Sequence, residues 1–86
     1  MKLKLVGSNQ TEVVLDDGSI IFYSYETPVA AYSAESGEYI KTRSWYSVTT
    51  SRHINKWLGE LNHREVDQDY LNHLSNSTTN SDDSLL

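Results

Sequence analysis

The sequence has no cysteine, one proline and four glycines among its 86 residues. Without cysteine it can form neither a disulfide framework nor a thiolate metal site, and it has no cysteine nucleophile, which fits a reducing cytosol. Its few glycines form no phosphate-binding loop, and no serine lies in a Gly-x-Ser-x-Gly pattern. Because these enzyme motifs are missing, we expect a non-enzymatic protein with no catalytic residues, no metal and no cofactor.

Long apolar runs are also missing. No run approaches the roughly 20 apolar residues that cross a bilayer, and the apolar run near the N-terminus is too short for the core of a signal peptide. We therefore expect a soluble protein without a membrane partner. A chain of 86 residues is enough for one domain, which we place at residues 1–74. Residues 75–86 are polar and of low complexity, so we expect a mobile, disordered tail.

Strand patterns fill the first half of the chain. Residues 2–6 alternate charged and apolar side chains, residues 11–15 return to this character, and residues 19–25 are mostly β-branched or aromatic. Between the last two, Asp16-Asp17-Gly18 predicts a hairpin turn, because glycine adopts a positive φ without steric cost. Further strands are expected over residues 29–33, 38–42 and 45–48, the last two being one bent strand or two short ones. Sequential strands tend to pair, so the pattern predicts five or six antiparallel strands in a small sheet or open barrel.

A helix is expected after these strands. Four apolar residues fall on one helical face at i, i+3, i+4 and i+7, namely Ile54, Trp57, Leu58 and Leu61. The hydroxyl residues at positions 49–51 can cap the first turn, so we expect a helix from about Ser51 to Leu61, ended by a left-handed Asn62. The apolar spacing is compatible with a second short helix from residue 64 or 65 to residue 74. The predicted fold class is therefore α+β, with a C-terminal helix packed on the sheet through a buried Trp57.

The charge of the chain is unevenly distributed. The net charge is −5, but residues 38–58 carry four cations and one acid, whereas the segments on both sides are acidic. Cations and aromatic rings alternate in this basic island. Its candidate binding residues are Lys41, Arg43, Trp45, Tyr46, Arg52 and Lys56. If Lys41, Arg43 and Trp45 alternate along one strand, they share a face of it.

Two interpretations of the basic island remain open. Cations that track phosphates and rings that stack on bases hold single-stranded nucleic acid, so the island can be a weak module of that kind. The other interpretation is that its charges are solvated and its rings pack against the domain. The small number of cations and the acidic flanking segments favour the second.

Six tyrosines are many for a chain of this size. Tyrosine is enriched at protein interfaces, where it brings a large contact area at low entropic cost, and it also fills small β cores with its hydroxyl at the surface. Strand alternation predicts that Tyr23 and Tyr25 share a face with Ile21, while Phe22 and Ile20 lie on the other. If the helix covers one of these faces, the other needs a cover or a partner.

The three histidines, His53, His63 and His73, are spaced by ten residues. Metal ligands on one helix are spaced by three or four residues, so this spacing does not predict a metal site. A zinc site can be drawn from His63 and neighbouring carboxylates, but solvated side chains explain the pattern better. A small metal-dependent enzyme is therefore the least favoured interpretation.

Two segments, Phe22–Ala31 and Tyr46–Leu58, resemble a family of small uncharacterised proteins of tailed bacteriophages. The likeness covers about residues 2–61. Because this family has no catalytic assignment, the resemblance supplies no functional residue. It implies an accessory protein in the host cytoplasm of an infected bacterium, which acts by binding a host or phage protein complex. A weak single-stranded nucleic-acid-binding module that uses residues 41–57 is the alternative.

Overall fold

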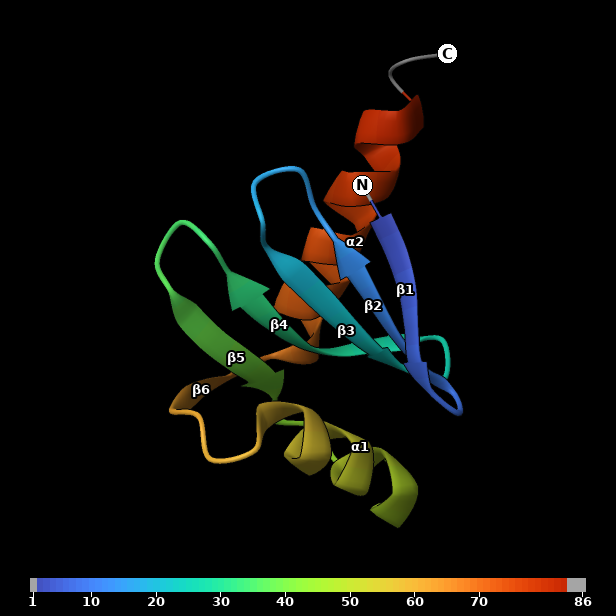
Figure 1. Ribbon diagram of the computed structural model, residues 1–86, viewed down its shortest axis with the longest axis vertical. Coiled ribbons are helices and arrows are strands. Elements are labelled where there is room, and N and C mark those ends of the chain that lie inside the picture. Colours follow the sequence, from blue (N-terminus) through green and yellow to red (C-terminus); the bar gives the residue numbers. More distant parts are fainter. Residues whose placement is uncertain (1, 84–86) are drawn as a thin grey trace.

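The computed structural model describes residues 2–83 and shows one six-stranded sheet with a helix on each face (Figure 1). In chain order the elements are β1 (Lys2–Gly7), β2 (Gln10–Val14), β3 (Ile20–Ser24), β4 (Thr27–Ser33), β5 (Glu38–Thr42), α1 (Val48–Leu58), β6 (His63–Val66) and α2 (Gln68–Asp83). The strands lie side by side in the order of the chain. This arrangement confirms the predicted α+β class, and of the two predicted forms, a small sheet or an open barrel, it is the sheet.

The first five strands form the predicted antiparallel meander. The hairpin predicted around Gly18 is present, and Gly18 takes a φ of 93°. The Asp17 carboxylate fixes this turn by accepting hydrogen bonds from the Ser19 backbone N–H at 2.8 Å and the Ser19 hydroxyl at 3.1 Å. Pro28 lies at the start of β4, beside a bulge that shifts the register between Phe22 and Tyr23 of β3.

The sixth strand is an unexpected element. Residues 63–66 form β6, which pairs with β5 in parallel, whereas the sequence pattern assigned residues 65 and 66 to a helix. The strand proposed over residues 45–48 is wrong, because the chain leaves the sheet after Thr42 and enters α1 at Val48. A parallel pair needs a long crossover connection, and α1 supplies it. Cross-strand ion pairs support β6, including Arg64 Nε to Glu38 Oε2 at 3.1 Å.

The helix α1 begins and ends earlier than predicted. Ser47 is its N-cap, in an extended conformation, and the Ser47 hydroxyl accepts a hydrogen bond from the Thr50 backbone N–H at 3.1 Å. Gly59, with a φ of 58°, is its C-cap in place of Asn62. Leu61 therefore lies beyond the helix and is 46% exposed, so it does not extend the buried apolar stripe. The hydroxyl residues at positions 49–51 lie inside α1, so the prediction that one of them caps the first turn is wrong; the extended backbone of Ser47 lets its hydroxyl cap the helix instead.

Each face of the sheet has its own apolar cluster. The first lies under α1 and consists of Phe22, Val29, Ala30, Ile54 and Leu58, with Tyr39 and Trp57 packed against it. The second lies under α2 and consists of Ala31, Ile40, Val66 and Leu71, with Leu74 packed against it. Neighbouring residues of a strand point to opposite faces, so β3 contributes Phe22 to one side and Ile21 to the other. The face that the sequence left without a cover is covered by α2 (Figure 1).

The helix α2 runs from Gln68 to Asp83, further along the chain than the short helix predicted to end at residue 74. The backbone of residues 75–83, where a disordered tail was predicted, is helical, and residues 84–86 lie outside the described part of the chain. Within residues 2–83, no helix has the length and apolar character needed to cross a membrane.

Candidate binding surface

The predicted basic island is divided by the pairing of β5 with β6. Lys41 Nζ lies 3.8 Å from Glu65 Oε2, and Arg43 Nε lies 3.0 Å from Asp67 Oδ1. Arg43 Nη2 also donates a hydrogen bond to the Glu65 carbonyl at 3.3 Å. β6 and the residue after it bring acids alongside β5. The charges of Lys41 and Arg43 are therefore partly balanced by ion pairs within the protein. These two predicted site residues therefore support the sheet edge.

Trp45 and Tyr46 lie in the short loop between β5 and α1. Trp45 is 72% exposed and Tyr46 is exposed as well. The loop is fixed at both ends, because the Ser44 backbone N–H donates to the Thr42 hydroxyl at 3.1 Å and Ser47 caps α1. Among residues 2–83, no aromatic ring stacks on either side chain. The chain therefore holds a large aromatic side chain in solvent from an anchored loop.

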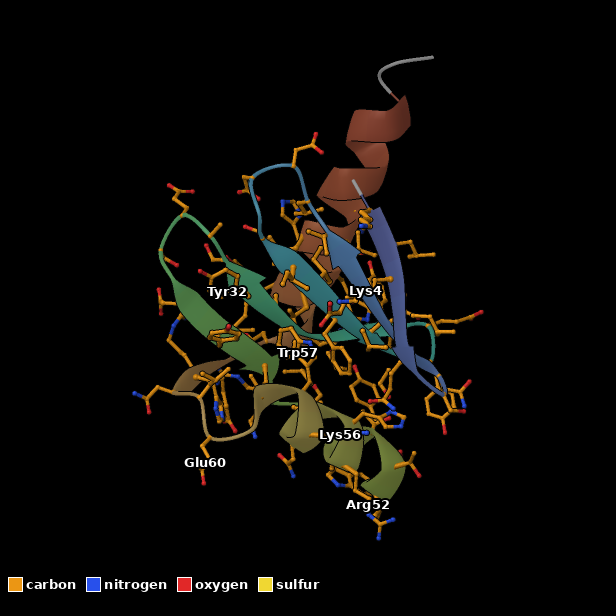
Figure 2. The ribbon with its side chains drawn as sticks, viewed as in Figure 1. Lys4, Tyr32, Arg52, Lys56, Trp57 and Glu60 are labelled. Carbon is orange, nitrogen blue, oxygen red and sulfur yellow. The ribbon has the colours of Figure 1, made fainter. Side chains whose placement is uncertain are left out.

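Arg52 and Lys56 lie on the exposed side of α1, one turn apart (Figure 2). Val48 precedes Arg52 by four residues and is exposed, so the three side chains form one row along the helix. No residue in the described part of the chain forms an ion pair with Arg52 or Lys56. The exposed residues of this row and of the loop before it, Trp45, Tyr46, Val48, Arg52 and Lys56, are here named the Trp45–Lys56 surface.

The structure corrects how this surface was expected to form. Lys41, Arg43 and Trp45 do not alternate along one strand, because β5 ends at Thr42. The Arg43 backbone N–H still donates to the Val66 carbonyl at 2.9 Å, so Arg43 stays at the sheet edge while Trp45 lies in the loop. Of the six predicted residues, four contribute to the surface, and Val48 is an addition. Its position four residues before Arg52 was the signal in the sequence.

The tyrosines are divided between core and surface. Tyr32 and Tyr39 pack together with ring centroids 4.7 Å apart, and Tyr39 contacts the Trp57 ring at 5.9 Å. Tyr23 and Tyr25 do not share a face, contrary to the prediction. The Tyr23 hydroxyl lies 2.6 Å from the Ser75 hydroxyl of α2, whereas Tyr25 has a φ of 58° in the following turn and its ring lies near His53 of α1. Strand alternation ends where β3 ends, one residue before Tyr25.

Trp57 is half-buried between α1 and the sheet (Figure 2). Its ring stacks on Phe22 with centroids 5.0 Å apart and planes inclined by 13°. Its indole N–H donates to Glu12 Oε2 of β2 at 2.6 Å, a charge-assisted bond. Trp57 packs against the core as predicted, but it is only partly buried.

The histidines lie apart from one another in their contacts. His53 Nδ1 is 2.8 Å from the hydroxyl of Ser24, which is also 3.0 Å from the Thr50 hydroxyl, and His63 Nδ1 is 3.0 Å from the Leu61 carbonyl. Ser24 is only 2% exposed, so its hydroxyl serves to fasten α1 to β3. Among the side chains that the structure describes, those of residues 2–76, no three of His, Asp or Glu gather in a group that could hold a metal ion.

A cleft of about 240 Å³ lies elsewhere, between α2 and the ends of the β2–β3 and β4–β5 hairpins. Apolar side chains line most of it, with Tyr70 and Leu74 on the helix side. Two of its polar side chains are used within the protein: Asp17 accepts from Ser19, and the Ser19 hydroxyl accepts from the Ala34 backbone N–H at 2.9 Å. The Trp45–Lys56 surface therefore remains the stronger candidate for binding.

Comparison with known proteins matches the chain to a protein family. The model of a family of unknown function (DUF8033) matches residues 1–73. No curated protein and no solved structure matches the chain. The match covers every strand and α1, together with the first residues of α2.

Proposed function

Since the chain belongs to a family of unknown function (DUF8033), we propose its function from its own geometry. It is a non-enzymatic module that acts by protein–protein contact, and the Trp45–Lys56 surface is its binding site. The observation that carries this proposal is the 72% exposure of Trp45 in an anchored loop. An indole held in water without an internal role gains most from a partner that removes its apolar area from water.

The composition of the surface supports a protein partner. Trp, Tyr and Arg are the residue types that dominate binding energy at protein interfaces, and Trp45, Tyr46 and Arg52 supply one of each. Ser47 caps α1 and anchors the end of the loop, so little conformational entropy is lost on binding. The exposed cations favour a partner with acidic groups around an apolar pocket for the indole.

The biological setting is also part of the proposal. The segments Phe22–Ala31 and Tyr46–Leu58 resemble small proteins of tailed bacteriophages, and the second of them contains most of the Trp45–Lys56 surface. We place the protein in the cytoplasm of an infected bacterium, as an accessory protein that binds a host or phage complex.

Binding of single-stranded nucleic acid is the second candidate function. It is favoured by two cations, Arg52 and Lys56, that have no ion-pair partner among the described residues and lie on the same surface as two stackable rings. Against it, Lys41 and Arg43 are paired with acids, and the whole chain has a net charge of −5. Phosphate binding needs several free cations, so the protein partner is favoured.

A comparison of variants tests the protein-binding proposal. Immobilised protein is used to capture proteins from the lysate of infected cells, with Trp45→Ala beside the unchanged chain. Tyr70→Ala is the matched control, because Tyr70 is also an exposed ring but lies on α2. A partner of the Trp45–Lys56 surface is retained by the control and reduced at least about tenfold by Trp45→Ala, the loss expected of a central interface residue. Equal capture by all three proteins contradicts the proposal.

Fluorescence anisotropy with a labelled single-stranded oligonucleotide separates the two functions. The nucleic-acid interpretation predicts binding at low salt that weakens steeply as salt rises and that is reduced by Arg52→Glu with Lys56→Glu. The protein-binding proposal predicts no change in anisotropy even at low salt.

A further inference from the structure

The first strand forms an open edge of the sheet. β1 pairs with β2 on its inner side, and within residues 2–83 no strand pairs with its outer side. Figure 1 shows β1 at the edge of the sheet away from β5 and β6. Alternate residues of such an edge direct backbone N–H and C=O groups outward, where another extended chain can bind them.

Two large apolar side chains of β1, Leu3 and Leu5, are exposed. Leu3 is 73% exposed and Leu5 is 76% exposed, and both lie on the face of the sheet that α2 covers further along. Lys2 and Lys4 alternate with them and point to the face of α1 (Figure 2 labels Lys4). β1 thus presents a row of leucines on one face and a row of lysines on the other.

The inner neighbour of β1 shows which chemistry fits this pattern. In β2, Val13 lies opposite Leu3, and Glu12 lies opposite Lys4. These two are the apolar pair and the oppositely charged pair that stabilise a sheet, whereas Lys2 lies opposite Val14 and Leu5 opposite Thr11. On the outer side of β1, the same leucine and lysine positions have no opposite strand among the described residues.

We propose that the outer edge of β1 binds an extended segment of a partner protein in which acidic and apolar residues alternate. The segment adds a seventh strand to the sheet. Its apolar side chains pack against Leu3 and Leu5, and its carboxylates lie beside Lys2 and Lys4. This site is independent of the Trp45–Lys56 surface, which lies on the loop before α1 and on α1 itself.

A second copy of this chain fits the edge less well. β1 carries two lysines and no acid, so a β1 strand from another copy brings no carboxylate to either lysine. Lysines on an edge strand also oppose pairing with other apolar strands. The same lysines that keep β1 from pairing with itself select for an acidic segment.

Two fluorescently labelled peptides test the proposal on the full chain. One alternates glutamate with valine, and the matched control alternates lysine with valine. The glutamate peptide is expected to bind, with hydrogen-exchange protection appearing at the outward amides of β1, and the lysine peptide to bind at least about tenfold more weakly. The double variant Lys2→Glu with Lys4→Glu is expected to reverse this preference.

Two controls keep the test specific. Trp45→Ala leaves the affinity for the glutamate peptide unchanged, so failure of the protein-binding proposal above does not affect this result. Circular dichroism of the lysine double variant confirms that the sheet is intact, since both lysines are exposed. Equal binding of the two peptides, protection elsewhere than β1, or association of the chain with itself through β1 in sedimentation would each overturn the inference.

Discussion

The two helices cover opposite faces of one sheet but are attached to it by different interactions. α2 packs through apolar side chains, with Leu71 fully buried and Leu74 beside it, and two hydrogen bonds join it to the sheet, from Gln68 Nε2 to the Pro28 carbonyl at 2.7 Å and between the Tyr23 and Ser75 hydroxyls at 2.6 Å. α1 has a stacked ring besides its apolar contacts and hydrogen bonds: Trp57 stacks on Phe22 and donates to Glu12, and the buried Ser24 hydroxyl joins β3 to the helix. Directional contacts fix the rotation and position of a helix more narrowly than apolar burial does.

This difference matches where the candidate site lies. The Trp45–Lys56 surface is carried by α1 and the loop before it, so its geometry depends on how firmly α1 is held. α1 is capped at both ends and is also the crossover between β5 and β6, so the chain connects it to the sheet on both sides. A binding surface on a rigid element loses less entropy when a partner binds.

The largest expected effect tests the apolar attachment of α2. Leu71→Ala removes the one fully buried side chain of α2 among residues 68–76 and should lower the free energy of unfolding by about 3–4 kcal/mol, because the vacated cavity adds to the lost burial. Urea unfolding followed by tryptophan fluorescence measures the loss. Leu71→Met is the control with nearly conserved volume. A loss no larger than that of the control would show that α2 contributes little to the core.

A smaller effect is expected for the attachment of α1. Trp57→Ala should lower the free energy of unfolding by about 3 kcal/mol, because the ring is half-buried and stacked. Trp57→Phe keeps a ring on Phe22 but removes the hydrogen bond to Glu12, and should cost about 1–2 kcal/mol. The same urea experiment applies, followed by circular dichroism. An unchanged midpoint for Trp57→Ala would contradict the role of this ring in the core.

The polar contact between β3 and α1 is expected to contribute less. Ser24→Ala leaves His53 Nδ1 and the Thr50 hydroxyl without this partner, at a cost of about 1–2 kcal/mol. A double-mutant cycle with His53→Ala isolates the coupling between the two side chains. Strictly additive losses would show that the contact does not hold α1 in place.

The smallest effect is expected from the end of the chain. Deleting residues 77–86 retains the Tyr23–Ser75 contact and removes only the polar part of α2 and the residues after it, so the melting temperature should stay nearly unchanged. Calorimetry of the two chains measures the difference. A loss of several degrees would instead show that the removed residues dock on the domain.

The strands in the first half of the chain could be predicted from the sequence because their signals are local. Alternation over residues 2–6, β-branched residues in β3 and the Asp-Gly turn each act within a few residues, and the structure confirms all three. β6 could not be predicted from the sequence, because only Val66 of its four residues is buried and because its pairing depends on the edge of β5. A short polar strand has no pattern of its own, and it forms because a neighbouring strand supplies hydrogen bonds.

Part of the candidate site could also be predicted from local sequence. Trp45, Tyr46, Arg52 and Lys56 lie close in sequence, and short range in sequence kept them close in space. Lys41 and Arg43 have the same charge but different surroundings, since Glu65 and Asp67 reach them from more than twenty residues further along the chain. The charge of the segment alone could not show that Lys41 and Arg43 form ion pairs, whereas Arg52 and Lys56 form none among the described residues.

The sequence by itself determined the fold class, the meander of β1 to β5 and the presence of an amphipathic helix, because these follow from side-chain periods and turn residues. The tertiary structure decided the parallel strand β6, the separation of Tyr23 from Tyr25 and the partners of each cation. It also decided that β6 pairs with β5, so that among the described residues no strand pairs with the outer side of β1. These outcomes depend on which distant segments meet, and the energy of such contacts exists only once the chain is folded.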